Sequence, residues 1–218
     1  MSAKVDVKYK DGSKIFFVSD THFGHSNIIK FCDRPFKDVE EMDRKLIENW
    51  NNKVPTDGLV FHLGDFGWGG YQEYKKIREQ LNGKIILIKG NHDFKNGCQS
   101  EAQYNELFEF TTQQLLIEIE GRKIYLNHVP FLCYGGTYRD PKGLVYQLHG
   151  HVHLSKNNPK GEDIGRVLKY EFPTQYDVGV DFNDYAPISW LDVNYKIQTQ
   201  IKEGKNMEIW MEKSKQKI

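Results

Sequence analysis

Three short apolar runs near the start of the chain, at positions 14–19, 58–65 and 84–93, each end in polar residues. Runs of this length with turn residues at their ends predict buried strands. Between them, apolar residues recur every three or four positions over 39–50 and 71–81, which predicts two amphipathic helices. This alternation of strand and helix is typical of a mainly parallel sheet covered by helices.

The ends of the two predicted helices carry capping and turn residues. Asp38 followed by Glu41 forms a capping-box pattern ahead of the first helix. Asn82 and Gly83 follow the last apolar position of the second helix and are expected to end it. Local sequence therefore supports both helices independently of their apolar spacing.

The remaining strands are predicted from alternation and turns. Apolar residues alternate with polar ones over 5–9, and Asp11-Gly12 offers a tight turn before the next strand, which predicts a hairpin. Downstream, 111–128 predicts two strands joined by a Glu-Gly turn, and 143–153 predicts a further strand that ends in histidines.

The C-terminal part mixes one clear helix with less regular segments. Residues 187–201 predict a helix capped by Ser189, whereas 154–172 is rich in Asn, Pro, Gly and charged residues and is expected to be a surface loop. Residues 213–218 are expected to form a frayed tail.

Composition sets limits on the class of protein. With 218 residues, 39% hydrophobic and 28% charged, the chain is expected to form one domain over 1–218. Its net charge is zero, which argues against an extended nucleic-acid groove. The three cysteines show no CxxC pairing, and no apolar window suits a signal peptide or a membrane span. We therefore expect a cytoplasmic protein without a membrane partner, its oligomeric state left open.

Candidate metal ligands collect where the predicted strands end. They are Asp20, His22, Asp65, Asn91, His92, Asp93, His128, His151 and His153. In open α/β sheets, ligands bind outside the carboxyl ends of the strands. Residues two apart on an extended backbone point to the same side, as in Asp-x-His and His-x-His. Carboxylates mixed with imidazoles suit borderline divalent metals such as Mn, Fe, Zn, Ni or Co.

Each fragment also has an ordinary explanation. Taken singly, "SDTH" and "LGD" are common turn sequences, and "GHVH" occurs as an exposed histidine pair as often as a metal pair. Five of the eight histidines lie in such fragments at predicted strand ends. Independent chance explanations do not account for that arrangement, so the fragments together predict a metal site.

The order of these fragments resembles the calcineurin-like metallophosphoesterases, whose motifs run D-x-H, G-D, G-N-H-[DE], H and G-H-x-H. This chain has "SDTH", "LGD", "KGNHD", "LNH" and "GHVH" in the same order, from Asp20 to His153. The resemblance implies an α/β fold, an αββα sandwich of two mixed β-sheets flanked by helices. Longer stretches of this chain are similar to those of small bacterial and phage members of the family.

The resemblance also implies roles for individual residues. One metal would be bound by Asp20, His22 and His153, the other by Asn91, His128 and His151, with Asp65 bridging both. His92 would be the catalytic histidine beside the leaving group. Two cations about 3.5–4 Å apart lower the pKa of a shared water, and the resulting hydroxide attacks phosphorus in line. An imidazole that protonates the departing oxygen contributes roughly 10²–10⁴-fold.

One motif departs from the family pattern. Many relatives continue the second motif as G-D-x-x-D, whose last aspartate helps orient the catalytic histidine, but this chain has "GDFGWGG". Asp93 or a backbone carbonyl is expected to orient His92 instead, so Asp93 joins His92 as a candidate catalytic residue. Trp68 stands where that second acid would be, and it could stack on a base, although an aromatic content of 13% favours chance placement.

Four residues are candidate substrate contacts: His25, Asn91, Arg34 and Arg139. His25 follows the first ligand pair and could reach a phosphate, or it could simply bond to the loop backbone. Arg34 could hold phosphate oxygens bidentately, although an arginine before proline is more often in a surface turn. Arg139 lies in a Gly-rich segment for which a solvated loop is the favoured alternative.

We expect a phosphoesterase with two divalent metal ions, manganese being favoured, that acts on a phosphodiester or nucleotide-type substrate. A phosphomonoesterase acting on a small phosphorylated substrate is the first alternative. A nuclease is disfavoured by the net neutrality of the chain, and a non-catalytic scaffold by the retention of every expected ligand.

Overall fold

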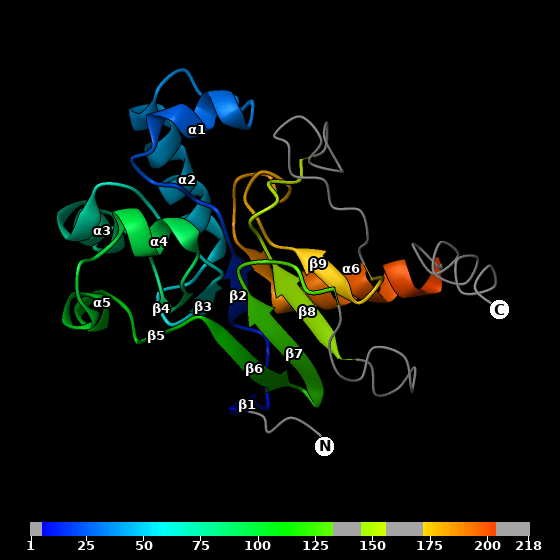
Figure 1. Cartoon of the computed structure of the whole chain (residues 1–218). Coiled ribbons are helices and arrows are strands. Elements are labelled where there is room, and N and C mark those ends of the chain that lie inside the picture. The colour runs from blue at the N-terminus through cyan, green and yellow to red at the C-terminus, as the bar shows by residue number, and fades with distance from the viewer. Residues whose placement is uncertain (1–5, 133–144, 156–171, 204–218) are drawn as a thin grey trace.

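The computed structural model describes residues 6–132, 145–155 and 172–203, whose strands form two five-stranded sheets (Figure 1). The first sheet has the order β1-β6-β7-β8-β9. Its strands are β1 (Val7–Tyr9), β6 (Gln114–Ile119), β7 (Arg122–Asn127), β8 (Tyr146–His149) and β9 (Gln175–Asp177). All its neighbours pair in parallel except β6 and β7.

The second sheet has the order β10-β2-β3-β4-β5. Its strands are β2 (Ile15–Val18), β3 (Leu59–His62), β4 (Lys84–Ile88), β5 (Phe110–Thr112) and β10 (Ile188–Ser189). Only β10 runs antiparallel to its neighbour β2. Both sheets are therefore mixed, and the predicted α/β sandwich of two mixed sheets flanked by helices is confirmed.

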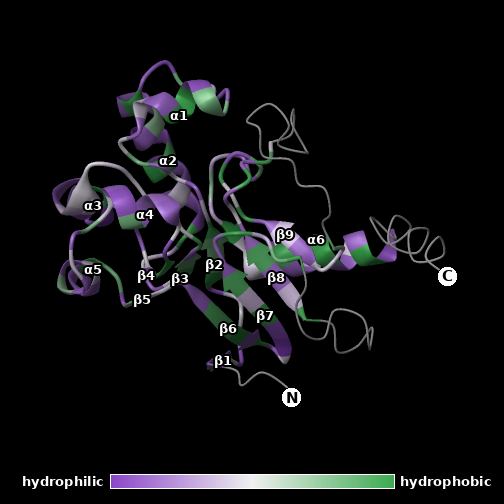
Figure 2. Ribbon diagram, in the orientation of Figure 1, coloured by the Kyte–Doolittle hydropathy of each residue, from purple (hydrophilic) through white to green (hydrophobic). Residues whose placement is uncertain are grey.

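Six helices within the described residues cover the sheets (Figure 1). They are α1 (Ser26–Phe31), α2 (Val39–Lys53), α3 (Gly70–Arg78), α4 (Asn91–Asn96), α5 (Glu101–Leu107) and α6 (Trp190–Lys202). None of them is long and apolar enough to cross a membrane. Figure 2 shows hydrophobic positions along the strands and mostly hydrophilic positions on α3 and α4.

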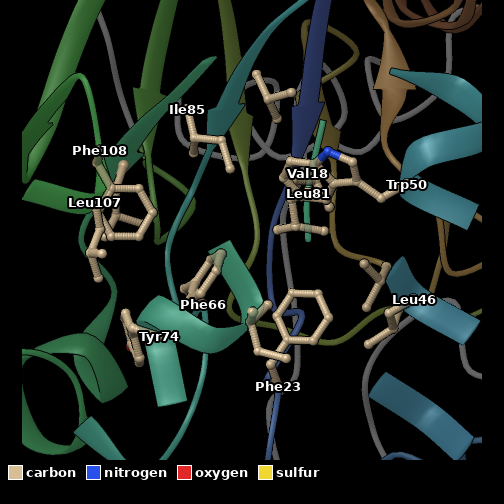
Figure 3. Close-up of a cluster of buried hydrophobic side chains, with 14 of the residues drawn as sticks. Val18, Phe23, Leu46, Trp50, Phe66, Tyr74, Leu81, Ile85, Leu107 and Phe108 are labelled. Atoms are coloured by element: carbon tan, nitrogen blue, oxygen red, sulfur yellow. The ribbon is translucent and has the colours of Figure 1, made fainter. Parts of the chain in front are cut away.

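Two hydrophobic clusters hold these layers together. The first joins the helix-facing side of β2–β4 to α2, α3 and α5. Figure 3 shows Phe66 and Phe23 at its centre, with Tyr74 on one side and Leu46 on the other. The second fills the space between the two sheets and includes Phe61, which is fully buried. Burying one large apolar side chain stabilises a fold by roughly 1.5–3 kcal/mol, so these clusters supply a rigid base for the loops above them.

The two predicted N-terminal caps are confirmed. Asp38 caps α2 by accepting a hydrogen bond from the Glu41 amide, while the Glu41 carboxylate accepts from the Lys37 amide. Ser189 caps α6. The predicted end of the second helix at Asn82-Gly83 is wrong, because α3 ends at Arg78, before Leu81, although Leu81 is buried in the first cluster. Apolar periodicity thus continued past the end of this helix.

The predicted N-terminal hairpin is wrong. Strand β1 pairs in parallel with β6 in one sheet, whereas β2 lies in the middle of the other sheet. The turn at Asp11-Gly12 does form, because Ser13 donates its amide to the Asp11 carboxylate and Ile15 donates to the Gly12 carbonyl. It carries the chain from one sheet to the other, since alternation defines the face of a strand but not its partner.

The predicted surface loop at 154–172 begins and ends in the interior, because Leu154 and Phe172 are both buried. Its central part, 156–171, and the predicted tail at 213–218 lie outside the described residues.

Candidate metal centre

The ends of five strands bring the predicted ligands to one edge of the sandwich. Strands β2, β3 and β4 are parallel neighbours, and the segments that follow them carry Asp20 with His22, then Asp65, then Asn91. The parallel pair β7 and β8 contributes its own ligands from the facing sheet; they are His128, His151 and His153. Because the carboxyl ends of parallel strands open at the same edge, one site collects ligands from both sheets.

A first group of ligand atoms surrounds Asp20. The ligand atoms of Asp20, His22 and His153 lie within 4.8 Å of one another, and all three residues are buried. His153 Nε2 is 3.7 Å from Asp20 Oδ1, and His22 Nε2 is 3.6 Å from Asp65 Oδ2. These three residues with Asp65 form the first predicted ligand set.

A second group lies on the other side of Asp65. His128 Nε2 is 3.4 Å from Asp65 Oδ2 and 3.1 Å from Asn91 Oδ1. His151 Nδ1 lies 3.2 Å from the same His128 nitrogen. One oxygen of Asp65 thus faces both groups, and all seven predicted metal ligands are brought together.

The unpartnered atoms of the site fit a cation. Asp20 Oδ1, His22 Nε2 and Asp65 Oδ2 are buried and have no hydrogen-bond partner within the described part of the chain. Each such buried group costs about 1–3 kcal/mol when nothing satisfies it. They converge on the positions that the two ligand groups surround, and their mixture of oxygen and nitrogen suits borderline divalent metals. The residues present therefore fit metal binding.

The histidines of the site have pKa values that are shifted in different directions. Burial lowers the pKa of His22 well below its ordinary value. At His128, burial acts in the same direction, but the carboxylates of Asp65 and Asp20 outweigh it and raise its pKa to about 9. A centre that stabilises an imidazolium also attracts a divalent cation, which displaces the proton when it binds.

Hydrogen bonds behind the ligands fix the orientation of two histidines. His128 Nδ1 lies 2.7 Å from the Leu63 carbonyl, and His153 Nδ1 lies 2.9 Å from Asp181 Oδ2. Each bond turns the Nε2 atom toward the metal position, as partners behind metal-binding histidines usually do. The side chain of Asp181 is buried, which by itself raises the pKa of its carboxyl. The positive charges of Arg34 and His153 outweigh this effect and lower that pKa to about 2.

Asp181 was missed as a site residue by sequence reasoning. A signal was present, because "YDVGVD" ends an apolar segment in an acid just as the recognised motifs do. No histidine follows it, so it lacked the feature that distinguished the other fragments.

Arg34 has a different role from the predicted one. Its side chain is buried, and its Nε and Nη2 atoms donate to the two oxygens of Asp181 at 2.8 and 3.0 Å. Its other donors bond the carbonyls of Asp20 and Thr21 and the sulfur of Met42. A guanidinium has five N–H donors, and these contacts use all of them, so none is left to hold a phosphate. Arg34 anchors the ligand loop instead.

Asp93 also supports the site from behind. Its buried carboxylate accepts four hydrogen bonds, from the amides of Asp65, Phe66 and Gly90 and from the Tyr74 hydroxyl. Burial and the nearby Asp65 charge raise the pKa of this carboxyl. These bonds tie the loop after β3 to the loop after β4, which is a different task from the predicted one of orienting His92.

His92 and His25 lie at the open side of the ligand groups. The amide of His92 donates to Asp65 Oδ1 at 2.8 Å, and its Nδ1 atom lies 3.4 Å from the Asn96 side-chain nitrogen. His25 stacks on Trp68 with ring centroids 4.3 Å apart, and its Nδ1 atom is 3.4 Å from that of His22. The structure thus places both histidines beside the ligands, while Arg139 lies outside the described residues.

The backbone of the ligand loops is strained. Five of the seven predicted ligands have positive φ angles, from 49° to 72°; they are Asp20, His22, Asp65, His151 and His153. A residue other than glycine in such a conformation costs of order 1–3 kcal/mol, and such residues cluster at functional sites. The arrangement is maintained by the Asp93 and Arg34 contacts described above.

Two glycines of the motifs allow this close approach. A Cβ atom at Gly90 would overlap Asp65 Oδ1, and one at Gly150 would overlap Ser19 Oγ and Asp20 Oδ2. The glycine of "GNHD" and that of "GHVH" are therefore required by the ligands beside them.

Comparison with known families agrees with this geometry. A sequence model described as calcineurin-like phosphoesterase matches residues 13–195. The chain belongs to this family. As a calcineurin-like phosphoesterase it is a hydrolase of phosphoric esters, and the family is metal-dependent, in agreement with the ligand groups.

Similar proteins span nearly the whole phosphoesterase. The uncharacterized protein MJ1445 of Methanocaldococcus jannaschii is 36% identical over 200 residues, which cover 88% of this chain and 93% of that protein. The gene 66 protein of Mycobacterium phage D29 is 26% identical over 219 residues, covering 88% and 99%. A crystal structure of the protein of unknown function AQ665 from Aquifex aeolicus is 28% identical with a TM-score of 0.61, covering 83% of this chain and 97% of that one.

Proposed function

We propose that this phosphoesterase hydrolyses a phosphodiester or nucleotide-type substrate with the help of two divalent cations. The observation that carries the proposal is the position of Asp65. Its buried Oδ2 atom lies 3.6 Å from His22 Nε2 and 3.4 Å from His128 Nε2, between the two ligand groups, and has no hydrogen-bond partner in the described residues. A carboxylate oxygen in this position suits a bridge between two cations.

Each cation would have its own ligands from this chain. One would be held by Asp20, His22 and His153, the other by Asn91, His128 and His151. When bound, a pair of divalent cations activates water as a nucleophile and neutralises charge on the phosphoryl group. Because Asn91 contributes a neutral oxygen, the ligands carry only two formal negative charges, from Asp20 and Asp65. Manganese is favoured by this mixture of oxygen and nitrogen, with Fe, Zn, Ni and Co as alternatives.

The chain's own residues would complete the reaction. His92 lies beside the ligands and would protonate the departing oxygen, an effect worth roughly 10²–10⁴-fold. His25 and Asn91 would contact the phosphoryl oxygens. Arg34 and Asp93 would act only through the loops that they hold.

The substrate is proposed to be small and phosphorylated, with a nucleotide as the class that the aromatic surface suits. Exposed aromatic side chains lie at the open side, where Trp68 is 37% exposed and stacks on His25. The ring of the exposed Phe31 lies 6.5 Å from the His25 ring, centroid to centroid. Aromatic rings beside a phosphate site can bind a base by stacking. The described cysteines Cys32 and Cys98 are free thiols, which supports the expected cytoplasmic location.

The test is metal removal followed by reloading with Mn²⁺ and assays on bis(4-nitrophenyl) phosphate, 4-nitrophenyl phosphate and cyclic nucleotides. Asp65→Asn is expected to lower kcat/KM by more than about 100-fold, since even partners behind a ligand are worth 10–100-fold. Asp57→Asn is the matched control, because this exposed carboxylate pairs with the exposed Lys14 and belongs to neither ligand group. Faster hydrolysis of the monoester than of the diester would favour a phosphomonoesterase instead. Absence of hydrolysis of all three substrates by the metal-loaded protein would contradict the proposal.

A further inference from the structure

Trp68 occupies a position at which its ring touches both histidines on the open side of the metal centre. Its ring stacks on His25 at 4.3 Å with an interplanar angle of 15°, and it lies 5.6 Å from the His92 ring at 45°. His25 and His92 are themselves 6.0 Å apart. The three rings therefore form a closed cluster beside the candidate ligand His22. The centroid of the His22 ring lies 5.4 Å from that of His25 and 5.1 Å from that of His92.

The backbone of Trp68 is fixed to the first ligand loop. Its amide donates to the Phe23 carbonyl at 2.7 Å, and Phe23 donates to the Phe66 carbonyl at 3.0 Å. A β-bridge between Phe23 and Gly67 joins the same two segments. Because Phe23 and Phe66 belong to the buried cluster, the backbone that carries the indole rests on packed core. The indole is thus anchored through its backbone, while Trp68 as a whole remains 37% exposed.

We propose that Trp68 is a positioning residue that aligns His92, together with His25, toward the leaving-group side of the metal centre. The inference rests on the proposed function, in which His92 protonates the departing oxygen. Trp68 stands at the position where relatives carry the second acid of their G-D-x-x-D motif. Indole has no acceptor and one N–H donor, so it acts on the histidines by ring packing and not by a carboxylate bond.

Loss of this packing has a specific consequence for catalysis. A displacement of about 1 Å at a reacting group can cost 10²-fold in rate. A misplaced proton donor slows the departure of a basic oxygen far more than that of 4-nitrophenolate, which leaves without protonation. Trp68 is not among the candidate metal ligands, so metal content is expected to stay the same, and any change in the binding of an aryl ester applies to both leaving groups alike.

The test compares Trp68→Leu with Trp68→Phe, which keeps an aromatic ring, in the metal-loaded full-length protein. Matched phosphodiesters carry either a 4-nitrophenyl or an unsubstituted phenyl leaving group. Trp68→Leu is expected to lower kcat for the phenyl ester about 10–100-fold and for the nitrophenyl ester less than about 3-fold. Trp68→Phe is expected to recover most of the loss. Tyr195→Leu, which removes an exposed ring on α6, is the control and should match the wild type.

The outcomes separate this inference from the function on which it rests. One outcome is that His92→Ala lowers kcat more for the phenyl ester than for the nitrophenyl ester while Trp68→Leu lowers both equally or neither. This result would overturn the positioning role of Trp68, but the proposed function would stand. Equal impairment of Trp68→Leu and Trp68→Phe also overturns it. If the wild type hydrolyses neither ester, or if His92→Ala treats both alike, the proposed function fails and the inference fails with it.

A second readout does not depend on activity. A ring stacked at 4.3 Å shifts the NMR resonances of the His25 ring protons upfield. In the zinc-loaded protein, Trp68→Leu is expected to move these resonances downfield, while Trp68→Phe retains part of the shift. Unchanged His25 resonances in Trp68→Leu would overturn the ring contact itself.

Discussion

Replacing Asp181 with asparagine removes a negative charge that both Arg34 and His153 use. Asp181 Oδ1 and Oδ2 accept from the Arg34 guanidinium at 2.8 and 3.0 Å, and Oδ2 also lies 2.9 Å from His153 Nδ1. An asparagine keeps one oxygen, so it can retain the bond to Arg34 Nε but not the bond to Nη2. The Arg34 side chain is fully buried, so its charge would be left without a counter-ion.

The expected loss of stability follows from this burial. Breaking a buried ion pair by removing one partner destabilises a protein by about 3–5 kcal/mol, which is a large share of a typical total of about 5–15 kcal/mol. The second effect is on metal affinity, because His153 loses the carboxylate that orients it, and such losses weaken binding about 10–100-fold. Asp181→Asn should therefore fold at 25 °C but unfold at a clearly lower urea concentration.

Two measurements check the prediction. Urea unfolding of the metal-free protein gives the free energy of unfolding, and titration with Mn²⁺ gives the affinity. Asp184→Asn, an exposed substitution on the same loop, is the matched control and should change neither. A free energy of unfolding within about 1 kcal/mol of the wild type would refute the buried-pair argument. An unchanged metal affinity would refute the role assigned to the Asp181–His153 bond.

Three further predictions concern the loops and the metal. Gly150→Ala should abolish tight metal binding, since its Cβ would overlap Ser19 Oγ and Asp20 Oδ2, and calorimetric titration with Mn²⁺ would contradict this if it found wild-type affinity. Burial raises the pKa of Asp43, which accepts from the Gly24 amide, to about 6 from an ordinary 3.8. Because the pKa is raised on folding, stability is fully present below pH 4 and falls as pH rises through 6. In urea unfolding, Asp43→Asn should thus be more stable than the wild type by about 1–2 kcal/mol at pH 8, a figure that allows for solvent screening, and equal to it at pH 4. Equal stability at pH 8 would disprove the raised pKa of Asp43 as the cause. Removal of the metal with a chelator should lower the melting temperature, by an amount that grows with the metal affinity of the untreated protein. An unchanged melting temperature after chelation would argue against metal binding to the folded state.

That candidate metal ligands would meet could be predicted from sequence because each follows a short apolar strand. The strands β2, β3 and β4 are parallel neighbours, so Asp20, Asp65 and Asn91 had to meet at one edge. His128 and His151 came from the other sheet, and nothing in their local sequence showed that this sheet would face the first. Only the order of motifs shared with the family indicated that meeting.

The residues behind the ligands were harder to predict because their roles depend on partners far away in the chain. Arg34 is 147 positions from Asp181, and Asp93 is 27 positions from the Phe66 amide that it binds. An arginine or an aspartate beside a motif suggests contact with substrate, but burial decides otherwise, since a buried charge must first be satisfied by its neighbours. The hairpin prediction failed for the same reason, as the partner of β1 is set by the packing of two sheets.

The most direct test of the account is the number of metal ions bound per chain, measured by elemental analysis after saturation with Mn²⁺ and removal of the excess. We predict about two ions for the wild type and for Asp57→Asn, and at most about one for Asp65→Asn, because the shared oxygen is then lost. Fewer than about two ions in the wild type, or two ions held equally tightly by Asp65→Asn, would contradict the central claim that Asp65 bridges two cations.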